Sequence, residues 1–303
     1  MPPVLTAVIT VGALTMVLAT LLVVANRKLF VEEDPRIDLV EDMLPHANCG
    51  ACGFPGCRPF AEALVSGKVL PGLCTVSSED GRVRIASFLG VDVGAQEKQV
   101  ARLACAGGDN VARNHARYQG LSSCAAATLV SGGGKGCSWG CLGLGDCVVA
   151  CDFDALHMNA HSLPVVDVDK CTACGDCVTA CPKDLFSIHA IGHKLWVNCK
   201  SELAGDEILA DCEVACTACG RCAMDAPKLV TMRDNLPVID YAAVRQAEGQ
   251  GGREAREARE SAARTSIERC PTGAIVWLEG GRLVKGGAAK KIIRQGARPE
   301  APT

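Results

Sequence analysis

The sequence has few aromatic side chains: phenylalanine, tyrosine and tryptophan make up 4% of its 303 residues. That is too few large side chains for an ordinary hydrophobic core of this length, so something besides apolar packing must organise the fold. The chain also lacks the Gly-x-Gly-x-x-Gly fingerprint with its ribose-binding acid, and the phosphate-binding Walker loop. We therefore assign it no nucleotide site and no catalytic residue. A net charge of −3 gives no reason to expect a nucleic-acid partner.

Cysteine, in contrast, is abundant: the chain has twenty, bunched in threes and fours. A disulfide framework would spread them, and a chain this long does not need stapling. Cysteines two residues apart cannot easily bridge each other, but their thiolates can converge on one inorganic cluster. Zinc is the alternative, yet it usually takes two Cys-x-x-Cys pairs or histidines, and the six histidines lie outside the cysteine runs. The pattern predicts 4Fe–4S clusters and one-electron transfer.

The first predicted cluster site is the segment Cys49-Gly-Ala-Cys52-Gly-Phe-Pro-Gly-Cys57, followed after sixteen residues by Cys74. Its glycines permit a backbone that folds around a cluster. A short helix expected over residues 59–66 would return Cys74 to the site. Three closely spaced ligands and one distant ligand are a strong signal for a cluster.

The second and third predicted sites form a two-cluster ferredoxin module. Residues 171–182 carry the bacterial ferredoxin signature, and a looser run of cysteines precedes them at residues 137–151. In that fold the fourth cysteine of each run ligates the cluster of the other run. Short strands are expected over residues 152–158 and 185–189. The expected ligand sets are Cys137, Cys141, Cys147 and Cys181 for one cluster, and Cys171, Cys174, Cys177 and Cys151 for the other.

The fourth predicted site belongs to a module that has lost part of its pattern. A third run begins at Cys216, but Ala226 stands where its fourth cysteine should be, and Cys270-Pro271 ends a run whose first three cysteines are missing. Every missing ligand belongs to the same cluster, so one cluster was lost as a unit. The lost ligands would lie in residues 242–269, and residues 253–260 within that segment are expected to form an exposed helix or a flexible insertion. The complete set that remains is Cys216, Cys219, Cys222 and Cys270.

Four cysteines remain: Cys105, Cys124, Cys199 and Cys212. A single cysteine of this kind is more often a buried apolar thiol than a ligand. Together they are enough for a fifth cluster, and glycine pairs and triplets near residues 107 and 133 supply tight turns. The sequence therefore predicts four clusters, or five if these four also bind.

Residues 4–25 form an uncharged apolar stretch, long enough at about 1.5 Å per residue to cross a hydrocarbon core of about 30 Å. Arg27 and Lys28 follow it, and no lysine or arginine precedes it. By the positive-inside rule the C-terminal bulk stays in the cytoplasm. A cleaved signal peptide is the alternative, but the stretch lacks a basic start and is long for one. We expect a single uncleaved anchor in the cytoplasmic membrane.

These features predict an α+β chain with a membrane helix, a small α-rich cluster domain and tandem ferredoxin-like modules. The predicted divisions are an anchor over 1–30, a 4Fe–4S domain over 31–90, a linker region and two-cluster module over 91–198, a second module with one cluster lost over 199–284, and a basic tail over 285–303.

The order of the pieces resembles the B subunit of the Rnf electron-transport complex, in its long form with additional ferredoxin repeats. The resemblance covers nearly the whole chain, and residues 49–74 are its most specific part. The segments that carry it are the anchor, Asn48–Cys57, Cys105-Ala-Gly-Gly, Lys135–Cys147, Cys171-Thr-Ala-Cys174 and Asn235–Tyr241.

The resemblance implies a relay protein that takes electrons from reduced soluble ferredoxin and passes them to membrane and flavin-bearing subunits. The complex would couple ferredoxin–NAD oxidoreduction to translocation of Na⁺ or H⁺, and the 49–74 site would lie nearest the membrane subunits. The departure at Ala226 implies that one cluster usual in the long form is absent, which leaves the electron entry point open. The alternatives are an iron–sulfur relay of another membrane system, such as one that reduces a redox-sensing regulator or serves a hydrogenase, and a zinc-bound scaffold.

Overall fold

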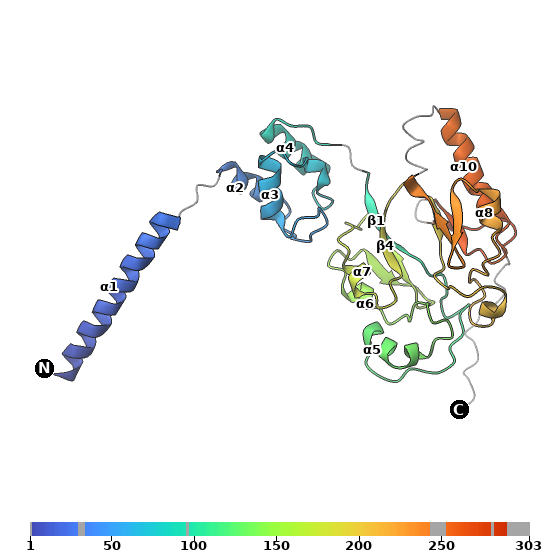
Figure 1. Cartoon of the computed structure of the whole chain (residues 1–303), viewed down its shortest axis with the longest axis horizontal. Helices are drawn as coiled ribbons and strands as arrows, with labels where there is room; N and C mark the ends of the chain where they lie inside the picture. Colours follow the sequence, from blue (N-terminus) through green and yellow to red (C-terminus); the bar gives the residue numbers. More distant parts are fainter. Residues whose placement is uncertain (1, 30–33, 95–96, 243–252, 280–281, 290–303) are drawn as a thin grey trace.

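The computed structural model describes residues 2–29, 34–94, 97–242, 253–279 and 282–289 and has the α+β content predicted (Figure 1). Its first element is the long helix α1 (Pro3–Leu29), whose apolar side chains are exposed, and which is long and apolar enough to cross a membrane. The hydroxyls of Thr10, Thr15 and Thr20 donate to main-chain carbonyls of the preceding turn. Hydroxyls satisfied within the helix suit a hydrocarbon environment.

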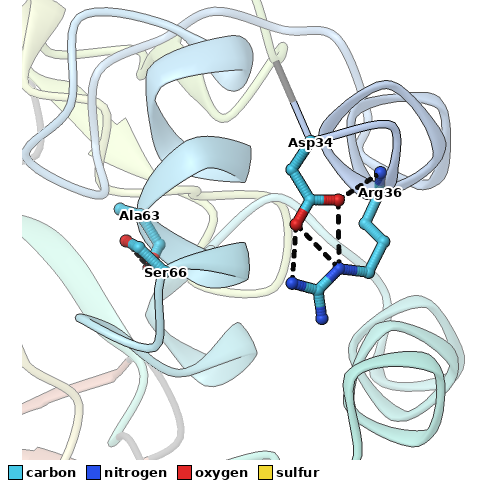
Figure 2. A network of polar contacts seen from close by, with 4 residues as sticks. All are labelled: Asp34, Arg36, Ala63 and Ser66. Atoms are coloured by element: carbon cyan, nitrogen blue, oxygen red, sulfur yellow. Dashed lines mark hydrogen bonds and ion pairs between the residues drawn. The ribbon is translucent and has the colours of Figure 1, made fainter. Parts of the chain in front are cut away.

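A small helical unit follows, made of α2 (Arg36–Met43), α3 (Cys57–Val65), the 3-10 turn η1 (Pro71–Leu73) and α4 (Glu79–Leu89). Its core is apolar, with Val40, Phe60 and Ile85 almost fully buried. Figure 2 shows how its helix ends are fixed: Arg36 pairs with Asp34 at the start of α2, and the Ser66 hydroxyl donates to the Ala63 carbonyl at the end of α3. Helix α3 confirms the helix expected over 59–66.

The next unit, which we call module one, consists of two antiparallel strand pairs and short helices. Strand β1 pairs with β4, and β2 pairs with β3 in a hairpin. Strands β2 and β4 are the two expected near residues 152–158 and 185–189. The elements are β1 (Gln99–Leu103), α5 (Cys124–Leu129), the 3-10 turn η2 (Ser131–Gly134), α6 (Asp146–Val149), β2 (Leu156–Met158), β3 (Pro164–Val166), α7 (Asp176–Ala180) and β4 (Phe186–Ala190).

Module two repeats this order. Strand β5 pairs with β8 as β1 pairs with β4, and the hairpin of β6 and β7 corresponds to that of β2 and β3. The elements are β5 (Leu195–Val197), the 3-10 turn η3 (Glu207–Ala210), α8 (Arg221–Asp225), β6 (Val230–Arg233), β7 (Leu236–Ile239), α10 (Arg253–Glu268), β8 (Ile275–Glu279) and β9 (Arg282–Val284), which pairs with β8. The tandem ferredoxin-like arrangement is thus present.

The strand pairs bear on two of the predicted divisions. The boundary after residue 198 would assign Leu195–Val197 to the first module, but these residues form β5 and pair with β8 of the second. Residues 99–103 lie inside the predicted division 91–198, which combines a linker region with the two-cluster module, and they form β1 and pair with β4. The sequence did not reveal either strand because each lies outside the cysteine runs of its module.

The predicted basic tail is described only as far as residue 289. Residues 285–289 pack against the end of α10, where the Ala288 amide donates to the Glu268 carbonyl and the Gly287 amide to the Glu268 carboxylate. Residues 290–303 lie outside the described residues. The first part of this segment therefore belongs to module two.

Helix α10 takes the place of the cysteine run that module two lacks. It packs on α8, as α7 packs on α6 in module one. Ala226, which replaces the missing fourth cysteine, is buried in the same apolar cluster as Ala263 and Ile267 of α10. Apolar side chains thus fill the space that a second cluster would need. Of the two alternatives predicted for residues 253–260, the structure has the helix.

Candidate metal centres

The twenty cysteines are all free of disulfide bonds and group into five sets of four, which we call sites I to V. The four cysteines of each of sites II to V line one cavity, with volumes of about 340, 380, 340 and 350 Å³ in that order. The sets are site I (Cys49, Cys52, Cys57, Cys74), site II (Cys151, Cys171, Cys174, Cys177), site III (Cys124, Cys141, Cys147, Cys181), site IV (Cys105, Cys137, Cys199, Cys212) and site V (Cys216, Cys219, Cys222, Cys270).

Site I is built on the helical unit. Cys57 opens α3, and its amide donates to the side-chain oxygen of Asn48 at 2.8 Å. Asn48 has a φ of +47°, a conformation that asparagine adopts more readily than most residues. Burial raises the pKa of Cys52, and the nearby thiols of Cys74 and Cys49 add to the shift. The structure therefore brings together the four cysteines predicted for this site, and it assigns Asn48 the task of capping the helix that carries Cys57.

Sites II, III and V share one local fold. In each, a glycine with φ between +70° and +94° precedes a short helix whose second residue is a ligand candidate. Glycine adopts this left-handed conformation without steric cost, so the spacing Gly-x-Cys sets the direction of the cysteine. The pairs are Gly145 with Cys147, Gly175 with Cys177 and Gly220 with Cys222.

Site III differs from the predicted set by one cysteine. Cys124, from the first residue of α5, lines the cavity with Cys141, Cys147 and Cys181. Cys137, predicted to be their partner, lines the neighbouring cavity of site IV instead. The predicted grouping of these two cysteines is therefore corrected: they exchange places.

The cause of the exchange is visible in the spacing of the runs. Aligned on Gly145 and Gly175, residues 141–151 match residues 171–181, and Leu144 stands where Cys174 is a ligand candidate. The run of module one therefore begins at Cys141 and lacks its second cysteine, which Cys124 replaces from outside the run. Aligning the two runs on their glycines, rather than counting cysteines, would have found this.

Asp146 holds Cys124 in place. Its carboxylate accepts hydrogen bonds from the amides of Cys124 and Ala125 at 2.8 and 3.0 Å, and from the Ser123 hydroxyl at 2.9 Å. Burial acts to raise the pKa of Asp146, but these donors outweigh it, so the pKa lies below its usual value. Since Asp146 precedes Cys147, it ties the start of α5 to the start of α6. The sequence offered no sign of this role.

Burial is the main cause of a raised thiol pKa in these sites. Burial, with neighbouring thiols as a further cause, raises the pKa of Cys141, Cys147, Cys177, Cys212 and Cys216 to about 12. Thiols grouped in this way stay protonated at neutral pH unless cations bind. Metal binding must therefore displace their protons, which couples assembly of the sites to metal supply.

The surroundings of the sulfurs suit iron–sulfur clusters. Main-chain amides point at them, including those of Ala101 toward Cys171 at 3.4 Å and Leu185 toward Cys181 at 3.5 Å. Such hydrogen bonds tune the potential of a cluster. Among the described residues, no three His, Cys, Asp or Glu side chains are close enough to share one metal ion. Four thiols that line one cavity form the ligand set that a four-iron cluster requires.

Three family models match the chain in the regions of these sites. An Fe–S cluster family matches residues 44–76, which contain site I. A 4Fe-4S binding domain matches residues 163–187, with most of site II. A 4Fe-4S single cluster domain matches residues 208–277, which contain all of site V. The chain carries 4Fe–4S clusters, and the single-cluster description agrees with the apolar filling of module two.

Curated relatives match over most of the chain. The B subunit of the proton-translocating ferredoxin:NAD(+) oxidoreductase complex of Clostridium ljungdahlii is 35% identical over 86% of this chain and 87% of the relative. The chain belongs to the family of Rnf complex B subunits.

Two further relatives agree with this assignment. The B subunit of the Na(+)-translocating ferredoxin:NAD(+) oxidoreductase complex of Acetobacterium woodii is 38% identical over 78% of this chain and 71% of its own length. The B subunit of the ion-translocating oxidoreductase complex of Methanosarcina acetivorans is 38% identical over 71% of this chain and 82% of its own length. The resemblance to the Rnf family noted from the sequence is confirmed.

Proposed function

We propose that this chain is the electron-relay subunit of an ion-translocating ferredoxin–NAD oxidoreductase complex. The grouping of cysteines into sets that follow one another along the chain carries the proposal, together with the names of its relatives. Clusters bound at these sets supply one-electron storage. The ligands that we assign are the cysteines of sites I, II, III and V. The protein's part is to hold adjoining sites at short range and to shield them from water.

Site V has the features of an electron entry point. Cys219 is exposed, whereas the other nineteen cysteines are buried or half-buried. The exposed Arg221 lies two residues from it, and Arg269 pairs with Asp225 nearby. An exposed ligand beside the cationic Arg221 suits a small acidic iron–sulfur carrier such as reduced ferredoxin. One electron would leave the donor and reduce site V, and no bond or proton is transferred.

The membrane end of the relay is assigned to α1 and site I. Arg27 and Lys28 end α1, and by the positive-inside rule they favour a cytoplasmic position for the modules, in the compartment of soluble ferredoxin. A single pass then leaves site I between the anchor and module one along the chain (Figure 1). From site I an electron would pass to flavin-bearing and integral subunits of the complex.

Stopped-flow reduction of the anaerobic full-length chain by reduced ferredoxin tests this proposal. Reversing the charge with Arg221→Glu should slow the reduction about tenfold at low ionic strength, and salt should abolish the difference. Arg233→Glu is the matched control. Arg233 is exposed on β6 of the same module, and its substitution by glutamate changes the net charge by the same amount.

The control variant should reduce at nearly the wild-type rate. Equal slowing by both variants would remove site V as the entry point. A wild-type chain that carries clusters but is not reduced by ferredoxin would contradict the relay function itself.

A further inference from the structure

Site IV lies between the two modules, and no family model or ferredoxin run accounts for it. Its four cysteines come from four separate segments, and they line a cavity of about 340 Å³, which matches the volumes at sites II and V. We propose that Cys105, Cys137, Cys199 and Cys212 hold a fifth 4Fe–4S cluster that joins the two modules into one electron path. The proposal rests on the relay function proposed above.

The ligand positions obey the internal repeat. Cys105 lies two residues beyond β1, and Cys199 lies two residues beyond β5, the equivalent strand of module two. Cys137 lies four residues before the first cysteine of its module's run, and Cys212 lies four residues before that of module two. Each module thus contributes the same two positions to the shared site. Four unrelated buried thiols would have no reason to follow the repeat.

Matching hydrogen bonds join site IV to its neighbours on both sides. The amide of Cys141, a residue of site III, donates to the sulfur of Cys105 at 3.4 Å. The amide of Cys216, a residue of site V, donates to the sulfur of Cys199 at 3.3 Å. In both modules, therefore, the first cysteine of the run belongs to one site and its amide contacts a sulfur of the next.

The sulfurs of site IV have the same main-chain surroundings as those of the recognised sites. The amides of Gly107 and Ser201 lie at the sulfurs of Cys105 and Cys199, at 3.4 and 3.5 Å. The Trp139 amide bonds the Cys137 sulfur in the same i to i+2 relation.

Gly107 lies close against this site. A Cβ at that position would stand 3.1 Å from the Cys212 sulfur and 3.7 Å from the Cys105 sulfur. The backbone thus approaches two thiols closely, as expected around a cluster.

Lys135 ties the site IV loop to site III. Its ammonium group donates to the carbonyls of Gly107 and Cys141, at 2.6 and 2.5 Å. Lys135 also lines the cavity of site IV. One cation thus serves both sites, and it favours the added electron at each.

The path that results runs from site V through IV and III to II. Sites III and II are already joined by the crossover of Cys151 and Cys181 between the two runs of module one. At each step one electron leaves one site as the next gains it, and no bond forms or breaks. Without site IV, the described residues offer no cysteine set between site V and module one.

Iron and acid-labile sulfide per full-length chain, purified without oxygen, give the first test. Site IV predicts about twenty irons in the wild type, and about sixteen if its thiols are structural. A count of sixteen would overturn this proposal and leave the relay function standing, whereas a chain without iron would overturn both. This count needs no variant and so does not depend on the folding of one.

Paired substitutions test the ligand set. Cys105→Ala with Cys199→Ala should remove about four irons, because both belong to one site, and Cys124→Ala with Cys199→Ala should remove about eight. A loss of only four in the second pair would mean that Cys124 belongs to site IV, and would overturn the ligand set.

Electron flow in the first pair tests the path. Reduced ferredoxin should reduce site V in this variant and fail to reduce sites I to III on the same timescale, while dithionite reduces all four. Unchanged reduction of sites I to III by ferredoxin would overturn the bridging role.

Discussion

Modules one and two have the same order of strands and helices, but their interiors differ in how much of the buried core is cysteine. Three of the eight buried residues at the centre of module one are cysteines of its sites: Cys147, Cys171 and Cys177. In module two only Cys222 is such a cysteine among nine, and the rest are apolar side chains, most of them contributed by β5, β6, α10 and β8. One module is thus organised by clusters, and the other by a cluster on one side and an ordinary core on the other.

The difference shows that a cluster and a set of apolar side chains can occupy the same place in this fold. Where module one has α7 and the cysteines of the run Cys171–Cys177, module two has α10, with Ala263 and Ile267 against Ala226. Apolar area buried by the longer helix stabilises module two, whereas bonds between cysteines and a cluster stabilise the same region of module one. The low aromatic content of the chain fits this view, because clusters replace the large side chains that a core would otherwise need.

Removal of iron should have the most extensive effect, because it acts on every site at once, and it should distinguish the two modules. When iron is chelated anaerobically, the hydrogen-exchange protection of the β1 and β4 amides should fall at least about 100-fold. That factor corresponds to a loss of about 2.7 kcal/mol in the free energy of opening. Those of β5 and β8 should lose much less, because the apolar cluster remains. Equal loss in both strand pairs would show that the core of module two cannot stand without its cluster.

The reverse experiment attacks the core of module two. Ile267 is 3% exposed, and Ile267→Ala should lower the free energy of unfolding of module two by about 2 to 5 kcal/mol through the cavity it leaves. Leu129→Ala is the control, because Leu129 is 87% exposed on α5 and its truncation should change little. Urea unfolding followed by hydrogen exchange at β8 measures both. A similar loss at β1 and β4 in the Ile267 variant would mean that the modules do not unfold separately.

The sequence predicted what is local in this fold. The helix that carries Cys57 and the β4 strand follow from nearby residues, and the set of Cys216, Cys219, Cys222 and Cys270 follows from spacing and the crossover. The loss of a cluster in module two was also predictable, since Ala226 and the absent run pointed to the same ligand set, and the buried contacts of Ala226 now give it a structural basis.

What the sequence did not predict depends on segments that meet only in the folded chain. Cys124 joins site III from seventeen residues before Cys141, and its partner Asp146 lies in another helix. Nothing in the spacing of cysteines distinguishes Cys124 from Cys137 unless Leu144 is seen as a vacant ligand position. Likewise β5 is too short to show a pattern, and only its pairing with β8 assigns it to module two.

The smallest predicted effect compares two equivalent aspartates, one in each run of module one. Asp146 accepts three hydrogen bonds from the start of α5 and the residue before it. Asp176, at the same position of the second run, instead contacts Cys174 of its own run. Asp146→Asn should therefore cost about 1 to 3 kcal/mol and loosen Cys124, and Asp176→Asn should cost less.

The pH dependence of Asp146 follows from its lowered pKa. Because the folded pKa lies below the unfolded value near 3.8, its contribution is complete above that value and is lost as the pH falls through the folded pKa. The difference in stability between wild type and Asp146→Asn should thus persist at neutral pH and shrink only in acid. Iron content and urea unfolding of both variants measure the effect, with loss of site III iron expected first in Asp146→Asn. If Asp176→Asn lost as much iron, the tie between α5 and α6 would not be what holds Cys124 at site III.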